Sequence, residues 1–116
     1  MIVHIVSRSH QAGPAGSLRF VTTSGHTRFL RMTVDETLSP ASRASLLGHE
    51  LQHAAEVARA TWVRDQDSFA SLYRQIGYAP GGTDGPDVYD TEAARRAGAA
   101  VFAEIRREPR RGTVLR

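Results

Sequence analysis

The sequence contains no cysteine, no lysine and no long uninterrupted hydrophobic segment. Without cysteine the chain has no disulfide, no thiolate ligand and no cysteine nucleophile, so any metal must be held by histidines and carboxylates. No apolar segment reaches the roughly 18 residues that a membrane span requires, and no basic segment precedes the short apolar start at residues 1–6. We therefore predict no membrane partner, and either a cytoplasmic protein or an exported one that has lost a leader.

The basic residues are unusual in kind but modest in number. All 15 of them are arginines, and the formal net charge is only +3. Several of these arginines gather in residues 106–116, but no aromatic side chains alternate with them, so stacking on nucleic-acid bases is not indicated. We interpret residues 108–116 as a solvent-exposed basic tail and predict no nucleic-acid partner, with nucleic-acid binding through this tail as the alternative.

The length and the pattern of the chain predict a single α+β domain over residues 1–116. Its first part, residues 2–34, reads as a small, mostly antiparallel sheet, and residues 39–107 read as a helical part that packs on the sheet. The predicted strands are Ile2–Val6, Leu18–Thr23 and Arg28–Val34, the last two paired as a hairpin. The predicted helices are Ser39–Ala60, capped by Ser39; Asp65–Gly77, capped by Asp65 or Asp67, with Tyr73 in its apolar stripe; and a third, capped by Asp90 or Thr91, that ends near Arg107. A glycine-rich loop, residues 78–87, precedes the third helix.

The first predicted helix carries a metal-binding motif, because residues 49–53 read His-Glu-Leu-Gln-His. His49 and His53 are four residues apart, so both imidazoles project from one helical face and can converge on one zinc ion. Glu50 lies roughly 100° further round the helix, where it can act as general base for a water that the metal activates. The alternative is a helix with two histidines that bind nothing.

A catalytic zinc site needs a third protein ligand. The candidates are Glu56, Glu92, an aspartate of the glycine-rich loop, or another histidine. Glu56 lies on the same straight helix as His49 and His53 and would close a tetrahedron poorly, so we interpret it as a residue behind the ligands or on the surface. Glu92 can reach across from the start of the third helix, where the helix dipole favours a carboxylate, although this effect alone would also explain a glutamate there. The remaining histidines, His4, His10 and His26, are interpreted as surface residues.

The motif at residues 49–53, followed by Tyr-Asp-Thr-Glu-Ala-Ala at residues 89–94, resembles the gluzincin metallopeptidases, particularly their minimal single-domain forms. The resemblance extends over about residues 28–104 and implies a zincin-like fold. It also implies one zinc ion per chain, held by His49, His53 and Glu92, with Glu50 as general base. The strand Arg28–Val34 would then lie beside the cleft, where an extended peptide or protein substrate could add as another strand.

The sequence departs from the gluzincin pattern in two places. Many gluzincins have an aspartate four residues after the ligand glutamate, where it bonds the second histidine, but this chain has Arg96 there. Asp87 and Asp90 are the candidate replacements. No tyrosine or histidine follows Glu92 to stabilise the oxyanion, so Tyr89, with Tyr78 as a further candidate, is predicted in that role. We predict a zinc-dependent metallopeptidase, the alternative being a metal-binding domain without peptidase activity that regulates or binds a partner; no oligomeric state is indicated.

Overall fold

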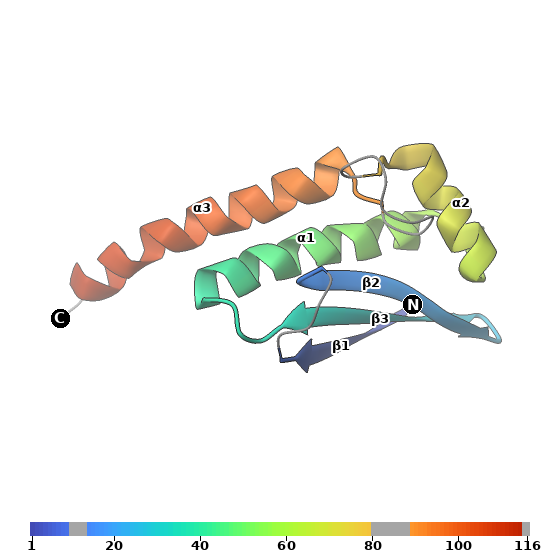
Figure 1. Cartoon of the computed structure of the whole chain (residues 1–116), viewed down its shortest axis with the longest axis horizontal. Coiled ribbons are helices and arrows are strands. Elements are labelled where there is room, and N and C mark those ends of the chain that lie inside the picture. The colour runs from blue at the N-terminus through green and yellow to red at the C-terminus, as the bar shows by residue number, and fades with distance from the viewer. Residues whose placement is uncertain (10–13, 80–88, 115–116) are drawn as a thin grey trace.

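We describe a computed structural model for residues 1–9, 14–79 and 89–114, with side chains described as far as residue 107 in the last range. Three strands precede three helices, as predicted (Figure 1). The elements are β1 (Ile2–Arg8), β2 (Gly16–Ser24), β3 (Thr27–Asp35), α1 (Pro40–Arg59), α2 (Gln66–Ile76) and α3 (Glu92–Val114). Most of the glycine-rich loop, including Asp87, and also His10 lie outside the described residues. No described helix is long and apolar enough to cross a membrane.

The sheet has the order β1-β3-β2, with β3 in the centre. The predicted hairpin is confirmed, because β2 and β3 pair antiparallel and their turn contains Gly25 at a φ of 60°. However, β1 pairs with β3 in parallel, so the prediction of a mostly antiparallel sheet is wrong and the sheet is mixed. The reason is the topology: the chain leaves β1 for the far edge of the sheet and returns through β3 between them, in the direction of β1.

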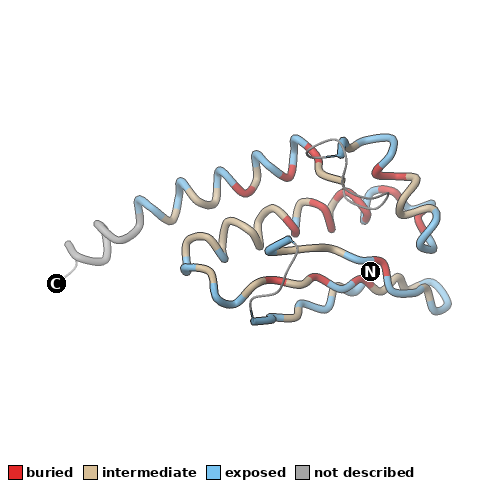
Figure 2. The backbone as a smooth tube through the Cα atoms, in the orientation of Figure 1, coloured by how far each residue is buried: buried red, intermediate tan, exposed pale blue. Residues whose placement is uncertain are grey.

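The core lies on one face of this sheet. Leu30, Met32 and Val34 alternate along β3 and are 1%, 0% and 7% exposed, as the period of two predicts. Figure 2 shows that buried positions gather where α1, α2 and the start of α3 meet one another and the sheet. The second half of α1, where the buried residues of this helix lie, is therefore held by the core.

Helix α1 forms the middle layer, with the sheet on one side and α3 on the other (Figure 1). Its start is the predicted one: Pro40 follows the cap residue Ser39, whose hydroxyl accepts a hydrogen bond from the Ser42 backbone. Contact with α3 is close, since a Cβ added at Gly48 would lie 2.8 Å from Cγ2 of Val101. Small residues are therefore required where the two helices cross.

The end of α1 is fixed by a side chain from the sheet. The Arg28 guanidinium donates hydrogen bonds to the backbone carbonyls of Val57, Ala60 and Val63 at 2.9, 3.0 and 3.3 Å. The Val57 and Ala60 carbonyls also accept from the backbone N–H groups of Ala60 and Val63, and the positive charge of Arg28 is favourable at the negative end of the helix dipole. Arg28 therefore holds the hairpin against the end of α1 and fixes the position of α1 along the sheet.

Helices α2 and α3 follow with recognisable caps. Asp65 caps α2 and forms a reciprocal pair of hydrogen bonds with Ser68, and the Thr91 hydroxyl accepts a hydrogen bond from the Ala94 N–H at the start of α3. Helix α3 continues past Pro109 to Val114, so the segment that we predicted to be a tail is helical as far as residue 114. Within this helix, Pro109 removes one backbone N–H donor.

Candidate metal centre

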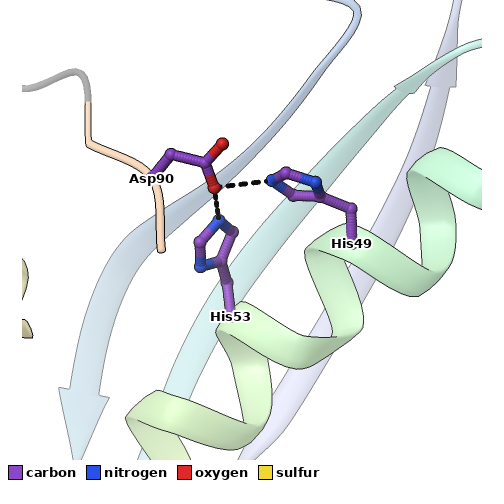
Figure 3. A group of neighbouring side chains, drawn as sticks. All are labelled: His49, His53 and Asp90. Atoms are coloured by element: carbon purple, nitrogen blue, oxygen red, sulfur yellow. Dashed lines mark ion pairs between the residues drawn. The ribbon is translucent and has the colours of Figure 1, made fainter. Parts of the chain in front are cut away.

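Three side chains converge where α1 passes the segment that precedes α3. His49 and His53 point from α1 toward the carboxylate of Asp90 (Figure 3). Oδ1 of Asp90 lies 2.9 Å from Nε2 of His49 and 3.3 Å from Nε2 of His53. We call these three residues the His-His-Asp group. Their potential ligand atoms all lie within 4.8 Å of one another.

The donor atoms of this group suit zinc in kind and in spacing. Two imidazole nitrogens and one carboxylate oxygen form a set that catalytic zinc sites use, with one position left for water or substrate. A tetrahedral ion with bonds of about 2.1 Å separates neighbouring ligand atoms by about 3.4 Å. The two separations from Asp90 are close to that value, and all three ligand atoms lie within 4.8 Å of one another, so the group has a size that one ion can occupy.

The structure does not bring Glu92 to the histidines. The Glu92 side chain is 61% exposed and pairs with Arg96, which is 79% exposed, one turn further along α3. Asp90, two positions before Glu92, lies beside the histidines instead. From the sequence, Asp90 was considered only as a cap or as a hydrogen-bond acceptor for an imidazole, and not as a candidate ligand, because no helical pattern reaches it. Its signal in the sequence was its position immediately before the cap residue Thr91.

Asp90 is positioned by its backbone as well as by its side chain. The Asp90 N–H donates to the Tyr78 carbonyl and the Asp90 carbonyl accepts from the Tyr78 N–H, both at 2.9 Å. These two bonds form an antiparallel bridge between Asp90 and Tyr78, just beyond the end of α2. The approach is close because Gly77 has no side chain: a Cβ there would lie 2.7 Å from the Asp90 carbonyl oxygen. The segment that carries the Asp90 carboxylate is thus held against the end of α2 by this bridge.

Glu50 is buried beside this group, with 6% of its surface exposed. The pKa of Glu50 is raised to about 7, mainly by burial; His53 lowers it, and the nearby Asp90 and Glu56 carboxylates contribute to the rise. A carboxyl group that titrates near neutral pH can both take up and release a proton under physiological conditions. The position and the pKa of Glu50 therefore suit a general base.

Behind His53 lies a second carboxylate. Oε1 of Glu56 is 2.8 Å from Nδ1 of His53, and Glu56 is only 9% exposed. Of the two interpretations given to Glu56 from the sequence, a residue behind the ligands agrees with this position and a surface residue does not. Tyr73 and Thr91 also bond to Glu56, and neither partner was anticipated, because the first was assigned to an apolar stripe and the second to a helix cap.

The His-His-Asp group opens into a pocket of about 320 Å³. Glu50 and Tyr89 also line this pocket, and its remaining wall is formed by apolar residues of β2 and α2, among them Leu18, Phe69 and Ala70. Tyr89 is therefore beside the site, as its predicted role requires. Tyr78 is 40% exposed and accepts a hydrogen bond from Arg95 on its hydroxyl. His4 and His26 are exposed, in agreement with their interpretation as surface residues.

The strand expected to receive a peptide is not available. β3, which contains Arg28–Val34, pairs with β1 on one side and with β2 on the other, so the prediction that a substrate pairs with this strand is wrong. The error has a simple cause, since the sequence indicated the hairpin but not the parallel pairing of β1. Among the described strands, β2 is an edge strand, and its residues 16–18 line the pocket.

Comparison of the chain with protein-family models, curated proteins and solved structures finds no match. Function is therefore inferred from the side chains at the site and from their geometry.

Proposed function

We propose that this protein is a zinc-dependent metallopeptidase in which His49, His53 and Asp90 hold the ion. The observation that carries the proposal is the orientation of His53. A neutral imidazole has one N–H, and an ionised Glu56 can only accept, so the proton belongs on Nδ1. Nε2 then presents a lone pair to the Asp90 carboxylate 3.3 Å away, an arrangement that is favourable when a cation lies between them.

The charge of the site points in the same direction. Glu50, Glu56 and Asp90 bring three carboxyl groups close to two imidazoles in a mostly buried region. Without a cation, this group must hold extra protons or bury uncompensated negative charge. A divalent ion would offset that charge, and its presence would lower the pKa of Glu50.

Each residue of the site has a role in the proposed hydrolysis of a peptide bond. A bound zinc ion supplies Lewis acidity that activates water and polarises the substrate carbonyl. Glu50 accepts the proton of the attacking water and then delivers it to the nitrogen of the leaving amine. Tyr89, which lines the pocket, is assigned to donate a hydrogen bond to the carbonyl oxygen as negative charge develops there.

The substrate proposed for this site is an extended peptide or an unfolded protein. Within the described part of the chain, one edge of β2 pairs with no other strand, and a peptide can bond there as an additional strand. Residues 16–18 of this strand also line the pocket, so a peptide on this edge would pass the His-His-Asp group. An aspartate as third ligand would distinguish the chain from the gluzincin pattern, in which a glutamate holds this position.

The ligand assignment is tested by zinc content after extensive dialysis, measured for the wild type and for two matched variants, Asp90→Ala and Glu92→Ala. Both variants remove one carboxylate near the start of α3, but only Asp90 belongs to the His-His-Asp group. We expect one zinc per chain in the wild type and in Glu92→Ala, and much less in Asp90→Ala. The reverse pattern would return the third ligand to Glu92, and a wild type that takes up no added zinc would overturn the proposal.

The catalytic assignment is tested separately, by incubating the zinc-loaded protein with an unfolded protein and with a peptide library. We expect cleavage by the wild type and none by Glu50→Gln, which should keep its zinc because Glu50 is not in the His-His-Asp group. Full activity in Glu50→Gln would refute the role of Glu50. Zinc binding without cleavage in the wild type would instead favour a metal-binding domain that regulates or binds a partner.

A further inference from the structure

The geometry points to Glu56 as the positioning residue of this site: one buried carboxylate orients His53 and also ties the segment that carries Asp90 to α1. The inference rests on the proposed function, because it concerns how the proposed zinc ligands are held. Glu56 itself lies outside the His-His-Asp group and is not assigned as a ligand.

Both oxygens of the Glu56 carboxylate are engaged, and every partner can act as a donor. Oε1 is 2.8 Å from Nδ1 of His53 and accepts from the Tyr73 hydroxyl at 3.2 Å. Oε2 accepts from the Thr91 hydroxyl at 2.6 Å. The three partners are 6%, 5% and 4% exposed, so the carboxylate is surrounded by donors in a region from which water is largely excluded. Hydrogen bonds to a charged acceptor in such a place are strong and directional.

The first consequence concerns the nitrogen that His53 offers. By accepting from Nδ1, Glu56 keeps the proton on that atom and leaves the lone pair on Nε2, which faces Asp90. The bond also fixes the rotation of the ring, since His53 and Glu56 are one turn apart on α1. His53 is therefore held in the one tautomer that can bind an ion between α1 and Asp90.

The second consequence reaches Asp90 through its neighbour. Thr91 donates its hydroxyl hydrogen to Glu56 while the same oxygen accepts from the Ala94 N–H, so the bond to Glu56 anchors the cap of α3 on α1. The Thr91 N–H in turn donates to Oδ1 of Asp90 at 2.8 Å. A displacement of Thr91 would thus move the Asp90 carboxylate relative to both histidines.

Tyr73 completes the arrangement from α2. Its hydroxyl lies 3.0 Å from the His53 carbonyl oxygen and 3.2 Å from Glu56, and its ring contacts the His53 imidazole edge-on at 5.4 Å between centroids. Burial and the adjacent Glu56 carboxylate raise the pKa of Tyr73 above its usual value, so the hydroxyl remains a donor at any physiological pH. Three elements, α1, α2 and the start of α3, therefore meet at one carboxylate.

The inference is tested with Glu56→Gln, which preserves the shape of the side chain but gives it an amide that can also donate to Nδ1. Zinc affinity is measured by competition with a chromophoric chelator, and we expect it to fall about 10- to 100-fold. The matched control is Glu104→Gln, which removes the same charge from an exposed site on α3, 70% exposed, and should bind zinc as the wild type does. Wild-type affinity in a folded Glu56→Gln variant would overturn the inference.

A second pair of variants addresses the link to Asp90, and it applies even if Glu56→Gln does not fold. Thr91→Val removes the hydroxyl while keeping the size of the side chain, whereas Thr91→Ser keeps the hydroxyl. We expect weaker zinc binding in Thr91→Val and recovery in Thr91→Ser, a pattern that loss of packing alone would not produce. Equal affinity in the valine variant and the wild type would contradict the proposed link.

A measurement on the metal-free protein separates this inference from the proposed function. Nitrogen chemical shifts of the imidazoles, recorded at a pH where histidines are neutral, report which ring nitrogen carries the proton. We expect His53 to be protonated on Nδ1 in the wild type and to be a mixture of tautomers in Glu56→Gln. Identical His53 signals in the two proteins would refute the role of Glu56, whereas failure of the wild type to bind zinc would refute the proposed function and leave this result standing.

Discussion

At the scale of single residues, the site depends on where each carboxylate is placed. Glu50, Glu56 and Asp90 are chemically similar, but one is buried with a raised pKa, one is enclosed by hydrogen-bond donors and one faces two imidazoles. In the proposed function, these environments correspond to proton transfer, positioning and ligation respectively. Environment, more than residue type, therefore separates the three roles.

Glu50 leads to a prediction about stability and pH in the metal-free protein. Its pKa is about 7 in the folded state and near 4.5 when unfolded, so its contribution to stability is fully present below pH 4.5 and is lost as the pH rises through 7. At 1.36 kcal/mol per pKa unit, the loss is on the order of 3 kcal/mol. We expect the wild type to lose roughly that much more free energy of unfolding than Glu50→Gln between pH 4.5 and pH 8, measured by urea unfolding with a chelator present.

The comparison with Glu50→Gln isolates this residue, because every other side chain is the same in the two proteins. Glu104→Gln serves as the control, since an exposed carboxylate should leave the pH dependence of the wild type unchanged. The same pH dependence in the wild type and in Glu50→Gln would show that Glu50 titrates normally, and would remove its raised pKa as an argument for a general base.

At the scale of elements, the site lies between a rigid helix and a segment that must be fastened to it. α1 is fixed by the sheet, by α3 and by the Arg28 cap at its end. The segment before α3 is fixed by the Tyr78–Asp90 bridge and by the bond from Thr91 to Glu56. The spacing between the histidines is therefore a property of α1, whereas the position of Asp90 depends on the contacts of its segment.

Gly77 gives a prediction at this scale. A Cβ at this position would lie 2.7 Å from the Asp90 carbonyl oxygen and 2.9 Å from the Tyr73 carbonyl oxygen, both of them backbone atoms that cannot rotate away. Gly77→Ala should displace the Tyr78–Asp90 bridge and reduce zinc affinity by about tenfold or more, the size of effect seen when the groups that orient a ligand are lost. The measurement is the same chelator competition.

The matched control is Gly25→Asn in the hairpin turn. A Cβ there has no heavy atom within 4 Å, and asparagine accepts the positive φ of this residue better than most side chains do. Zinc affinity should stay at the wild-type level. An equal loss in both glycine variants would indicate general destabilisation and not a displacement of Asp90.

At the scale of the whole molecule, zinc should act as a link between two parts of the fold. The ligands come from α1 and from the segment before α3, so an ion bound by the folded state joins layers that unfolding separates. At a free zinc concentration of 100 times Kd, the gain is about 2.7 kcal/mol, which corresponds to a rise in Tm of roughly 10 °C for a domain of this size.

Differential scanning calorimetry with and without zinc measures this effect. We expect the rise in Tm for the wild type, its reversal by a chelator, and little or no rise for Asp90→Ala, which lacks one of the three ligands. A rise of equal size in Asp90→Ala would mean that zinc binds elsewhere or without Asp90. That result would separate the stabilising effect of the ion from the proposed site.

The sequence by itself determined the features that depend on local patterns. The three helices, the β2–β3 hairpin and the buried alternation on β3 were all predictable, because each follows from neighbours within a few residues. The cap at Ser39 was predicted, whereas the sequence left two candidates for each of the other caps, from which the structure selects Asp65 and Thr91. The closeness of His49 and His53 belongs to this class too, since a helix fixes the separation of residues four positions apart.

Only the tertiary structure decided which residues complete the site. The parallel pairing of β1, the use of both edges of β3 and the arrival of Asp90, rather than Glu92, beside the histidines all depend on contacts between distant segments. A shift of two residues at the start of a helix turns a side chain through about 200°, so the choice between these carboxylates rested on how α3 enters the fold. Three contacts fix how α3 enters the fold: the bridge between Asp90 and Tyr78, the close approach that Gly77 permits, and the bond from Thr91 to Glu56. No pattern along the sequence predicts these contacts.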